Sequence, residues 1–150
     1  MPGHLIRRMQ QASLAIFDTE MARAGCDLTS VQYAALVAIA AQPGLDQATL
    51  ASVIAFDRVT TGGVIDRLEA KGDVRREMPS DDRRSRRLHV LPNGEAALHG
   101  ARPVVAAIQV KILTGLAAHE QALFLQLLEK ALDAVGDLRR TPLRVIAPSA

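Results

Sequence analysis

Apolar residues recur at helical spacing through most of the chain, and this pattern predicts six helices. The first covers about residues 4–24 and stops at Gly25. The second begins after Thr29 or Ser30, either of which is a good N-cap. It is apolar on nearly all sides, which predicts a central, buried helix. Four more helices are expected, over residues 46–54, 58–71, 95–117 and 119–139.

A different pattern follows the fourth predicted helix. Apolar and polar residues alternate from Val74 and again over residues 87–90, which is typical of β-strands. Pro-Ser-Asp-Asp at 79–82 favours a turn between them, and Pro92-Asn93-Gly94 ends the second strand. The sequence therefore predicts a mostly α fold (α+β) of six helices and one β-hairpin.

The third and fourth predicted helices form a helix-turn-helix candidate. A short turn joins them, and Asp57 can cap the second. That helix has an apolar face made of Thr61, Val64, Ile65 and Leu68, and its polar residues lie largely off this face. An arginine-rich hairpin that directly follows such a helix is typical of a winged DNA-binding domain.

The charge of the chain is concentrated in this region. The net charge is only +2, but residues 58–87 hold nine basic and six acidic residues, against nine and ten in the rest of the chain. Six of the 18 Lys and Arg residues fall between Arg75 and Arg87. Clustered Arg residues suit DNA, because the planar guanidinium pairs with phosphates and with guanine edges.

The candidate DNA contacts lie on the fourth helix and on the hairpin. On the helix they are Arg58, Thr60, Thr61, Gly62 and Arg67, and on the hairpin they are Asp82, Arg83, Arg84, Arg86 and Arg87. Two alternatives stay open. Arg67 could instead form a salt bridge with Glu69 or another neighbour. The Gly62-Gly63 pair could permit close approach to DNA or relieve crowding against a neighbouring helix.

Residues 64–76, together with Asp82-Arg83-Arg84 and Gly94, resemble the MarR family of bacterial transcription regulators, and the resemblance covers nearly all of the chain. It implies a single domain over residues 1–150, with dimerisation helices at 1–28 and 95–140 and a winged helix-turn-helix lobe at 29–94. It implies a homodimer on a pseudo-palindromic DNA operator, acting as a repressor that a small ligand releases. It also implies that Asp82 orients Arg84, which contacts DNA.

The chain departs from the family pattern in two places. Val90-Leu91 stands where the family usually has Leu-Thr, so Asn93 must cap the fifth helix or Pro92 must open it. The glycine pair at 62–63 replaces larger residues, which leaves the identity of the base-reading residues open.

A small aromatic acid, such as a hydroxynicotinate or a salicylate, is the expected effector. Its carboxylate would need cations or hydrogen-bond donors beside apolar walls. The candidate donors are His4, Arg7 and Arg8 on the first helix, Tyr33 on the second, and His99 and Arg102 on the fifth.

Other functions find less support in the sequence. There is no nucleophile motif or Gly-rich phosphate loop, and the four histidines lack metal-ligand spacing, so neither enzyme nor cofactor is expected. No apolar run is long enough for a membrane span, and the single cysteine fits a reducing cytoplasm. A thiol-oxidation sensor at Cys26 is disfavoured by the adjacent Asp27. The nearest rival is a sequence-tolerant, architectural DNA-binding protein without an inducer.

Overall fold

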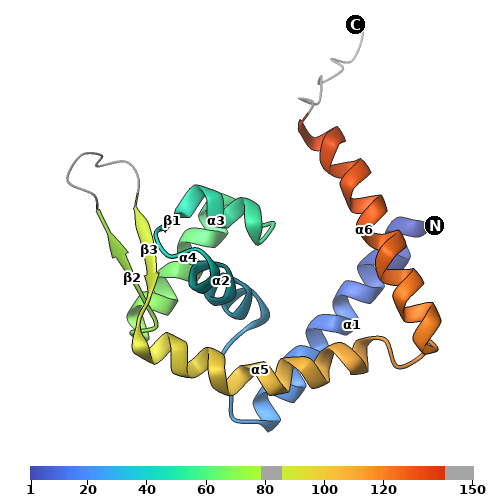
Figure 1. Ribbon diagram of the computed structural model, residues 1–150, viewed down its shortest axis with the longest axis horizontal. Coiled ribbons are helices and arrows are strands. Elements are labelled where there is room, and N and C mark those ends of the chain that lie inside the picture. The colour runs from blue at the N-terminus through green and yellow to red at the C-terminus, as the bar shows by residue number, and fades with distance from the viewer. Residues whose placement is uncertain (79–85, 141–150) are drawn as a thin grey trace, which may run out of the picture. The chain divides into compact units, whose positions relative to one another are not determined.

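A computed structural model of the protein describes residues 1–78 and 86–140 (Figure 1). The chain divides into two compact units, Met1–Ile112 and the part from Leu113 onward. Within the described residues, the elements are six helices and three short strands. They are α1 (Pro2–Arg23), α2 (Ser30–Ala41), β1 (Leu45–Asp46), α3 (Gln47–Val53), α4 (Arg58–Ala70), β2 (Val74–Glu77), β3 (Arg87–Val90), α5 (Pro92–Ile112) and α6 (Ala118–Arg140).

Helix α2 is the centre of the first unit, as its all-round apolar sequence predicts. Thr29 is its N-cap and forms a capping box, in which Thr29 Oγ1 accepts from Gln32 N and Gln32 Oε1 accepts from Thr29 N. This answers which of the two candidate residues caps the helix. Figure 1 shows α2 among α3, α4 and the sheet, and it packs on each of them as well as on α1 and α5. Ala35, Leu36 and Ile39 are fully buried there.

The predicted hairpin is present, but it belongs to a three-stranded antiparallel sheet of order β1-β3-β2. In β3, Leu88 is fully buried and the neighbouring Arg87 is exposed, as the expected alternation requires, whereas His89 and Val90 are both half-buried. Strand β1 was not predicted, because its two residues are too short to show alternation. It adds Leu45 opposite Leu88, so the inner edge of the hairpin is fastened to the connection between α2 and α3.

Helix α5 differs from its predicted range of 95–117 at both ends. It begins at Pro92, which lacks the N–H that would be unsatisfied at a helix start, so Pro92 and not an Asn93 cap opens the helix. It ends at Ile112. Beyond it, Gln121 Nε2 donates to the carbonyl oxygens of Leu113 (3.3 Å) and Leu116 (2.9 Å), so a side chain satisfies carbonyls that a longer helix would have bonded.

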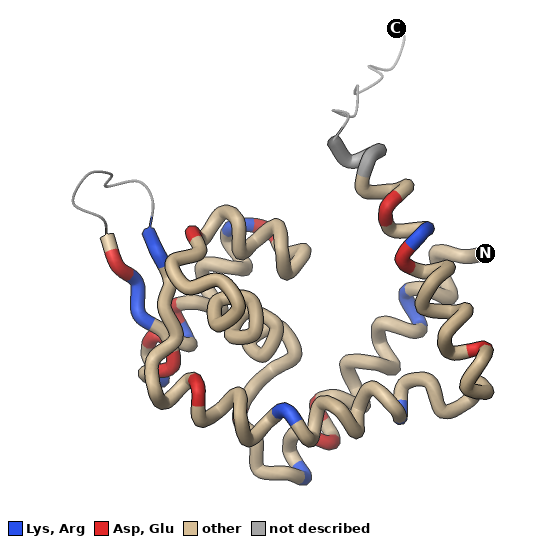
Figure 2. Tube along the Cα trace, viewed as in Figure 1, with Lys and Arg blue, Asp and Glu red and all other residues tan. Residues whose placement is uncertain are grey.

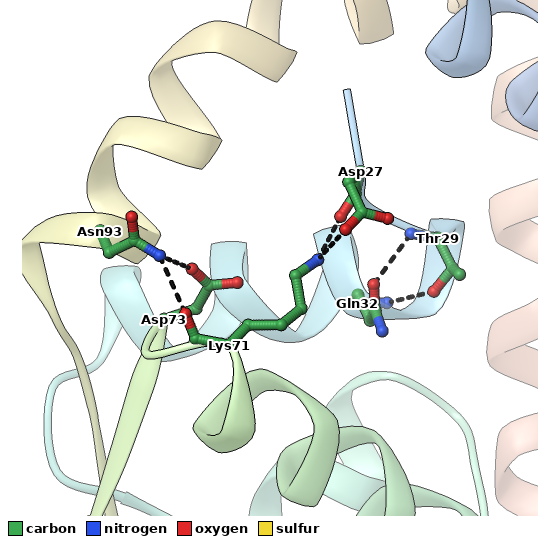
Figure 3. A network of polar contacts seen from close by, with 6 residues as sticks. All are labelled: Asp27, Thr29, Gln32, Lys71, Asp73 and Asn93. Carbon is green, nitrogen blue, oxygen red and sulfur yellow. Dashed lines mark hydrogen bonds and ion pairs between the residues drawn. The ribbon is translucent and has the colours of Figure 1, made fainter. Parts of the chain in front are cut away.

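The connection between α4 and β2 supports the first turn of α5 (Figure 3). The carbonyl oxygen of Asp73 accepts a hydrogen bond from Leu91 N at 2.8 Å. Asn93 Nδ2 donates to Asp73 Oδ1 at 2.6 Å and to the Lys71 carbonyl at 3.1 Å. A Cβ placed on Gly94 would lie 2.2 Å from the Asp73 carbonyl oxygen, so the two backbones touch and only glycine fits.

No single helix among the described residues is long and apolar enough to cross a membrane. Only α3 and α4 taken together reach the required length and composition, and they bend by 107° where they meet.

The close contact at Gly94 makes a stability prediction. Gly94→Ala should lower the free energy of unfolding by about 2 kcal/mol or more, because the new methyl group overlaps a backbone carbonyl that cannot yield freely. Gly100→Ala is the matched control, since it lies in the same helix and its Cβ would meet nothing within 4 Å. It should be neutral or stabilise by up to about 1 kcal/mol. Urea unfolding of both variants measures this, and equal midpoints would contradict the packing described here.

Candidate nucleic-acid interface

Helices α3 and α4 each begin at an aspartate that caps the backbone. Asp57 Oδ1 accepts from Thr60 N at 2.8 Å, and Thr60 Oγ1 donates to Asp57 Oδ2 at 2.6 Å. Asp46 makes the same pair of bonds with Thr49. The threonine hydroxyl bond, followed by the backbone bond, holds the pKa of each carboxyl below its ordinary value. These caps fix where the second helix of the predicted helix-turn-helix begins.

The turn between the helices is tight. Ala55 has a φ of 59°, in the left-handed region that commonly ends a helix, and Phe56 N donates to the Ala51 carbonyl at 3.1 Å. This closure lets α4 leave α3 at a steep angle and pack on α2.

The buried face of α4 is the one that the sequence predicts. Val64, Ile65 and Leu68 enter the core. Thr61 lies on the same face and is 0% exposed, so its prediction as a DNA contact is wrong. A side chain directed into the core cannot reach a groove. Arg58, Thr60 and Arg67 are exposed, as a DNA-facing surface requires.

The two glycines of α4 have different surroundings. A Cβ on Gly62 would lie 3.1 Å from Gln47 Nε2, so α3 crowds this position. A Cβ on Gly63 would meet nothing within 4 Å. Relief of crowding therefore accounts in part for Gly62 and not for Gly63, whose side of the helix is open.

Arg76 has a role that the sequence did not indicate. From strand β2, its Nη1 lies 2.6 Å from Asp66 Oδ1 and 2.7 Å from Glu69 Oε2, both on α4. Its Nη2 donates to the Gly62 carbonyl at 3.4 Å, and its side chain is only 14% exposed. Arg76 thus joins the hairpin to α4 and is occupied within the protein. The seven-residue separation from Glu69 gives no local signal, because the pairing depends on how β2 crosses α4.

This pairing also bears on Arg67. Glu69 is bonded to Arg76, and no ion pair of Arg67 occurs among residues 1–78 and 86–140. The alternative in which Arg67 is held by Glu69 is therefore not the arrangement in this structure.

Further basic residues lie along both described strands of the hairpin (Figure 2). Arg86 and Arg87 are exposed, while Arg75 Nη1 lies 3.5 Å from Glu77 Oε2. His89 Nε2 lies 3.0 Å from the same Glu77 oxygen, across the strand pair. The predicted contacts Asp82, Arg83 and Arg84 lie outside the described residues.

The candidate effector residues are dispersed. His4, Arg7 and Arg8 are exposed in the first turns of α1, and His99 and Arg102 are exposed on α5. Tyr33 is half-buried, with its ring centroid 6.3 Å from that of Phe17. Among residues 1–78 and 86–140, no hydrogen bond or ion pair joins the α1 donors to those of α5. Instead, α1 and α5 are bridged by Glu20 Oε1 and Lys111 Nζ at 2.7 Å, which lowers the pKa of Glu20.

A cavity of about 310 Å³ lies elsewhere in this unit, and none of the candidate effector residues lines it. Its walls come from the α1–α2 connection, the end of α4 and the first turns of α5. Lys71 lies on it and bonds Asp27, through the backbone carbonyl and, at 3.3 Å, through Oδ2 (Figure 3). Cys26 lies on it too and is half-buried. In the part of the chain described here, no three His, Cys, Asp or Glu side chains are grouped to hold a metal ion.

Comparison with known proteins gives a consistent result. Residues 28–85 match the model of the MarR family. The chain is 34% identical over 130 residues to the transcriptional regulator HosA of Escherichia coli, covering 87% of this chain and 93% of that protein. It is 32% identical over 134 residues to the transcriptional repressor NicR of Pseudomonas putida, covering 88% and 82%. These relatives are regulators and not enzymes.

Solved structures agree with this. PcaV of Streptomyces coelicolor, in complex with its natural ligand, is 34% identical with a TM-score of 0.79, over 90% of this chain and 94% of that one. BpsR of Bordetella bronchiseptica, whose DNA binding is regulated by 6-hydroxynicotinic acid, is 30% identical with a TM-score of 0.79, over 86% and 96%. The repressor CouR, bound to a 23-mer DNA duplex, is 26% identical with a TM-score of 0.79, over 87% and 92%.

The Asp57 cap makes a prediction with a defined sign in pH. Asp57→Ala removes both hydrogen bonds to Thr60 and should lower the free energy of unfolding. Asp57→Asn keeps a side-chain oxygen that can accept from Thr60 N, so this variant should retain most of the wild-type free energy of unfolding. Because the folded-state pKa is lowered, the stabilisation by the charge is complete above the ordinary Asp pKa and is lost as pH falls through the folded value.

Urea unfolding of wild type and both variants between about pH 3 and pH 7 tests this. The stability gap between wild type and Asp57→Ala should narrow toward the acid end. A gap that stays constant over this range would mean that the charge of Asp57 contributes nothing to the cap.

Proposed function

Because the chain belongs to the MarR family of transcriptional regulators, we propose that it is a repressor whose homodimer binds a pseudo-palindromic operator and is released by a small aromatic acid. The observation that carries this proposal is the capped helix α4. It directs Arg58, Thr60 and Arg67 away from the core, and the hairpin that packs on it through β2 carries exposed Arg86 and Arg87 at the start of its other strand, β3.

In this proposal α4 enters the major groove and the hairpin follows the phosphate backbone or the minor groove. Arg84, with Asp82 to orient it, acts with Arg86 and Arg87 in the wing, as the family resemblance implies. The 23-mer duplex bound to CouR supports DNA as the partner.

The homodimer is proposed to form through residues 1–28 and 95–140, with the lobe of residues 29–94 left free to bind DNA. Large apolar side chains are exposed on α6 and on α1, and such surfaces usually mark contacts with a partner. They include Leu123, Leu125, Leu127, Leu132 and Val135 on α6, and Leu5, Ile6 and Leu14 on α1. Two copies of α4 that read successive major grooves must lie about 34–36 Å apart.

The effector is proposed to be a hydroxylated aromatic acid. BpsR and NicR support this through the ligand and the repressor role that their descriptions give. His4, Arg7, Arg8, Tyr33, His99 and Arg102 remain the candidate donors. Release follows if the ligand binds more tightly to a dimer whose α4 spacing does not match the operator.

A salt titration tests the wing. Arg86→Ala and Arg87→Ala should each flatten the plot of log affinity against log salt concentration by roughly one unit, because each removes one phosphate contact. Arg23→Ala is the control: this exposed arginine pairs with Glu20 on α1, outside the proposed DNA surface, and its loss should leave the slope unchanged. Slopes for both wing variants equal to that of wild type would exclude the hairpin from the interface. Equal affinity for selected and random duplex would favour the sequence-tolerant alternative.

An effector panel tests release. At a fixed duplex concentration, 6-hydroxynicotinate or salicylate should dissociate the complex, and benzoate controls for a plain aromatic carboxylate. A real effector also obeys reciprocity: if it weakens DNA binding tenfold, saturating DNA must weaken effector binding tenfold. Calorimetric titration of the free protein and of the DNA complex measures both factors. Release of the duplex by a compound that the free protein does not bind would show that ionic strength, and not an effector site, causes the release.

A further inference from the structure

Val59 is the least expected residue on the outer surface of α4. It is 87% exposed, although it is β-branched and apolar. It follows Arg58 in the first turn, directly after the Asp57 cap. A large apolar side chain that is almost fully in water at the start of a DNA-facing helix has no structural task within this unit.

The direction of Val59 follows from helix geometry. Nine residues separate it from Leu68, which at about 100° per residue places the two on opposite sides of α4. Since Leu68 is fully buried, Val59 points straight away from the core. It is therefore the apolar side chain of α4 that reaches furthest toward a bound duplex.

The surroundings of Val59 leave its methyl groups accessible. Gly63 follows one turn later on the same side, and a Cβ there would meet nothing within 4 Å. Asp66 comes one further turn along, and its carboxylate is paired with Arg76 at 2.6 Å. The Arg76 guanidinium, which is shared between Asp66 and Glu69, offsets part of the acidic charge on this side of the helix.

The major groove offers one apolar group to such a side chain, which is the 5-methyl group of thymine. Arg58 and Arg67, both exposed on α4, can hold the helix in the groove by contacts to phosphates or guanine. We propose that Val59 contacts a thymine methyl group in each half-site and thereby selects a T·A pair at one operator position. This inference rests on the proposed function, because it requires sequence-specific DNA binding.

The experiment pairs a change in the protein with a change in the DNA. A duplex is first selected by the wild-type protein from a pool of random sequences. Each thymine of the half-site is then replaced, one position at a time, by deoxyuridine, which lacks only the methyl group. At one position, the wild-type protein should bind the uracil duplex about fourfold more weakly per half-site, the factor expected for one buried methyl group.

Val59→Ala should bind thymine and uracil duplexes equally at that position. Alanine is a better helix former than valine, so the variant is expected to fold. Val59→Thr keeps one methyl group and should retain part of the discrimination. Val53→Ala is the matched control, because Val53 is another exposed valine but lies on α3, and it should retain the full ratio.

The outcomes separate the two proposals. If the selection yields no preferred sequence, the proposed function fails and the inference fails with it. If a preferred sequence is found and Val59→Ala keeps the wild-type thymine-to-uracil ratio at every position, the proposed function stands and the role of Val59 is overturned.

Discussion

The backbone contact between Asp73 and Gly94 is the constraint on which the first unit depends. Three residues after the end of α4, the Asp73 carbonyl accepts a hydrogen bond from Leu91 N, and the absence of a side chain at Gly94 lets α5 start directly against it. Asn93 adds a bond to the Asp73 carboxylate. These hydrogen bonds and the backbone contact therefore fix the position of α5 relative to the C-terminal end of α4. A rotation of α5 must therefore move α4, the helix that carries Arg58 and Arg67, because the backbone of α5 is in direct contact with the segment that follows α4.

The arginines of the hairpin divide into two kinds. Arg76 is bonded within the protein, where it is shared between Asp66 and Glu69 and joins β2 to α4. Arg86 and Arg87 are exposed and remain available for phosphates. A count of basic residues alone therefore overstates the charge that a duplex would meet.

Local signals account for what the sequence predicted. The Asp57 cap, the apolar face of α4 and the alternation around Leu88 each depend on neighbours a few residues apart, and all are present in the structure. The misses depend on tertiary contacts. Strand β1 exists only because Leu45 meets Leu88, and the Arg76 pairing only because β2 crosses α4. Thr61 is a different case, because its place on the apolar face of the predicted helix already indicated burial, and its prediction as a DNA contact did not take this into account.

The glycine pair of α4 affects the local stability of this helix relative to the rest of the lobe. With two interior glycines, α4 has a low intrinsic tendency to be helical and takes its order from the packing of Ile65 and Leu68 on α2. Local opening of α4 should then require less free energy than unfolding of the whole unit. DNA affinity scales with the fraction of molecules in which α4 is closed. Losses of packing beneath this helix would therefore lower DNA affinity only once they bring the open form of α4 to a substantial fraction of the molecules.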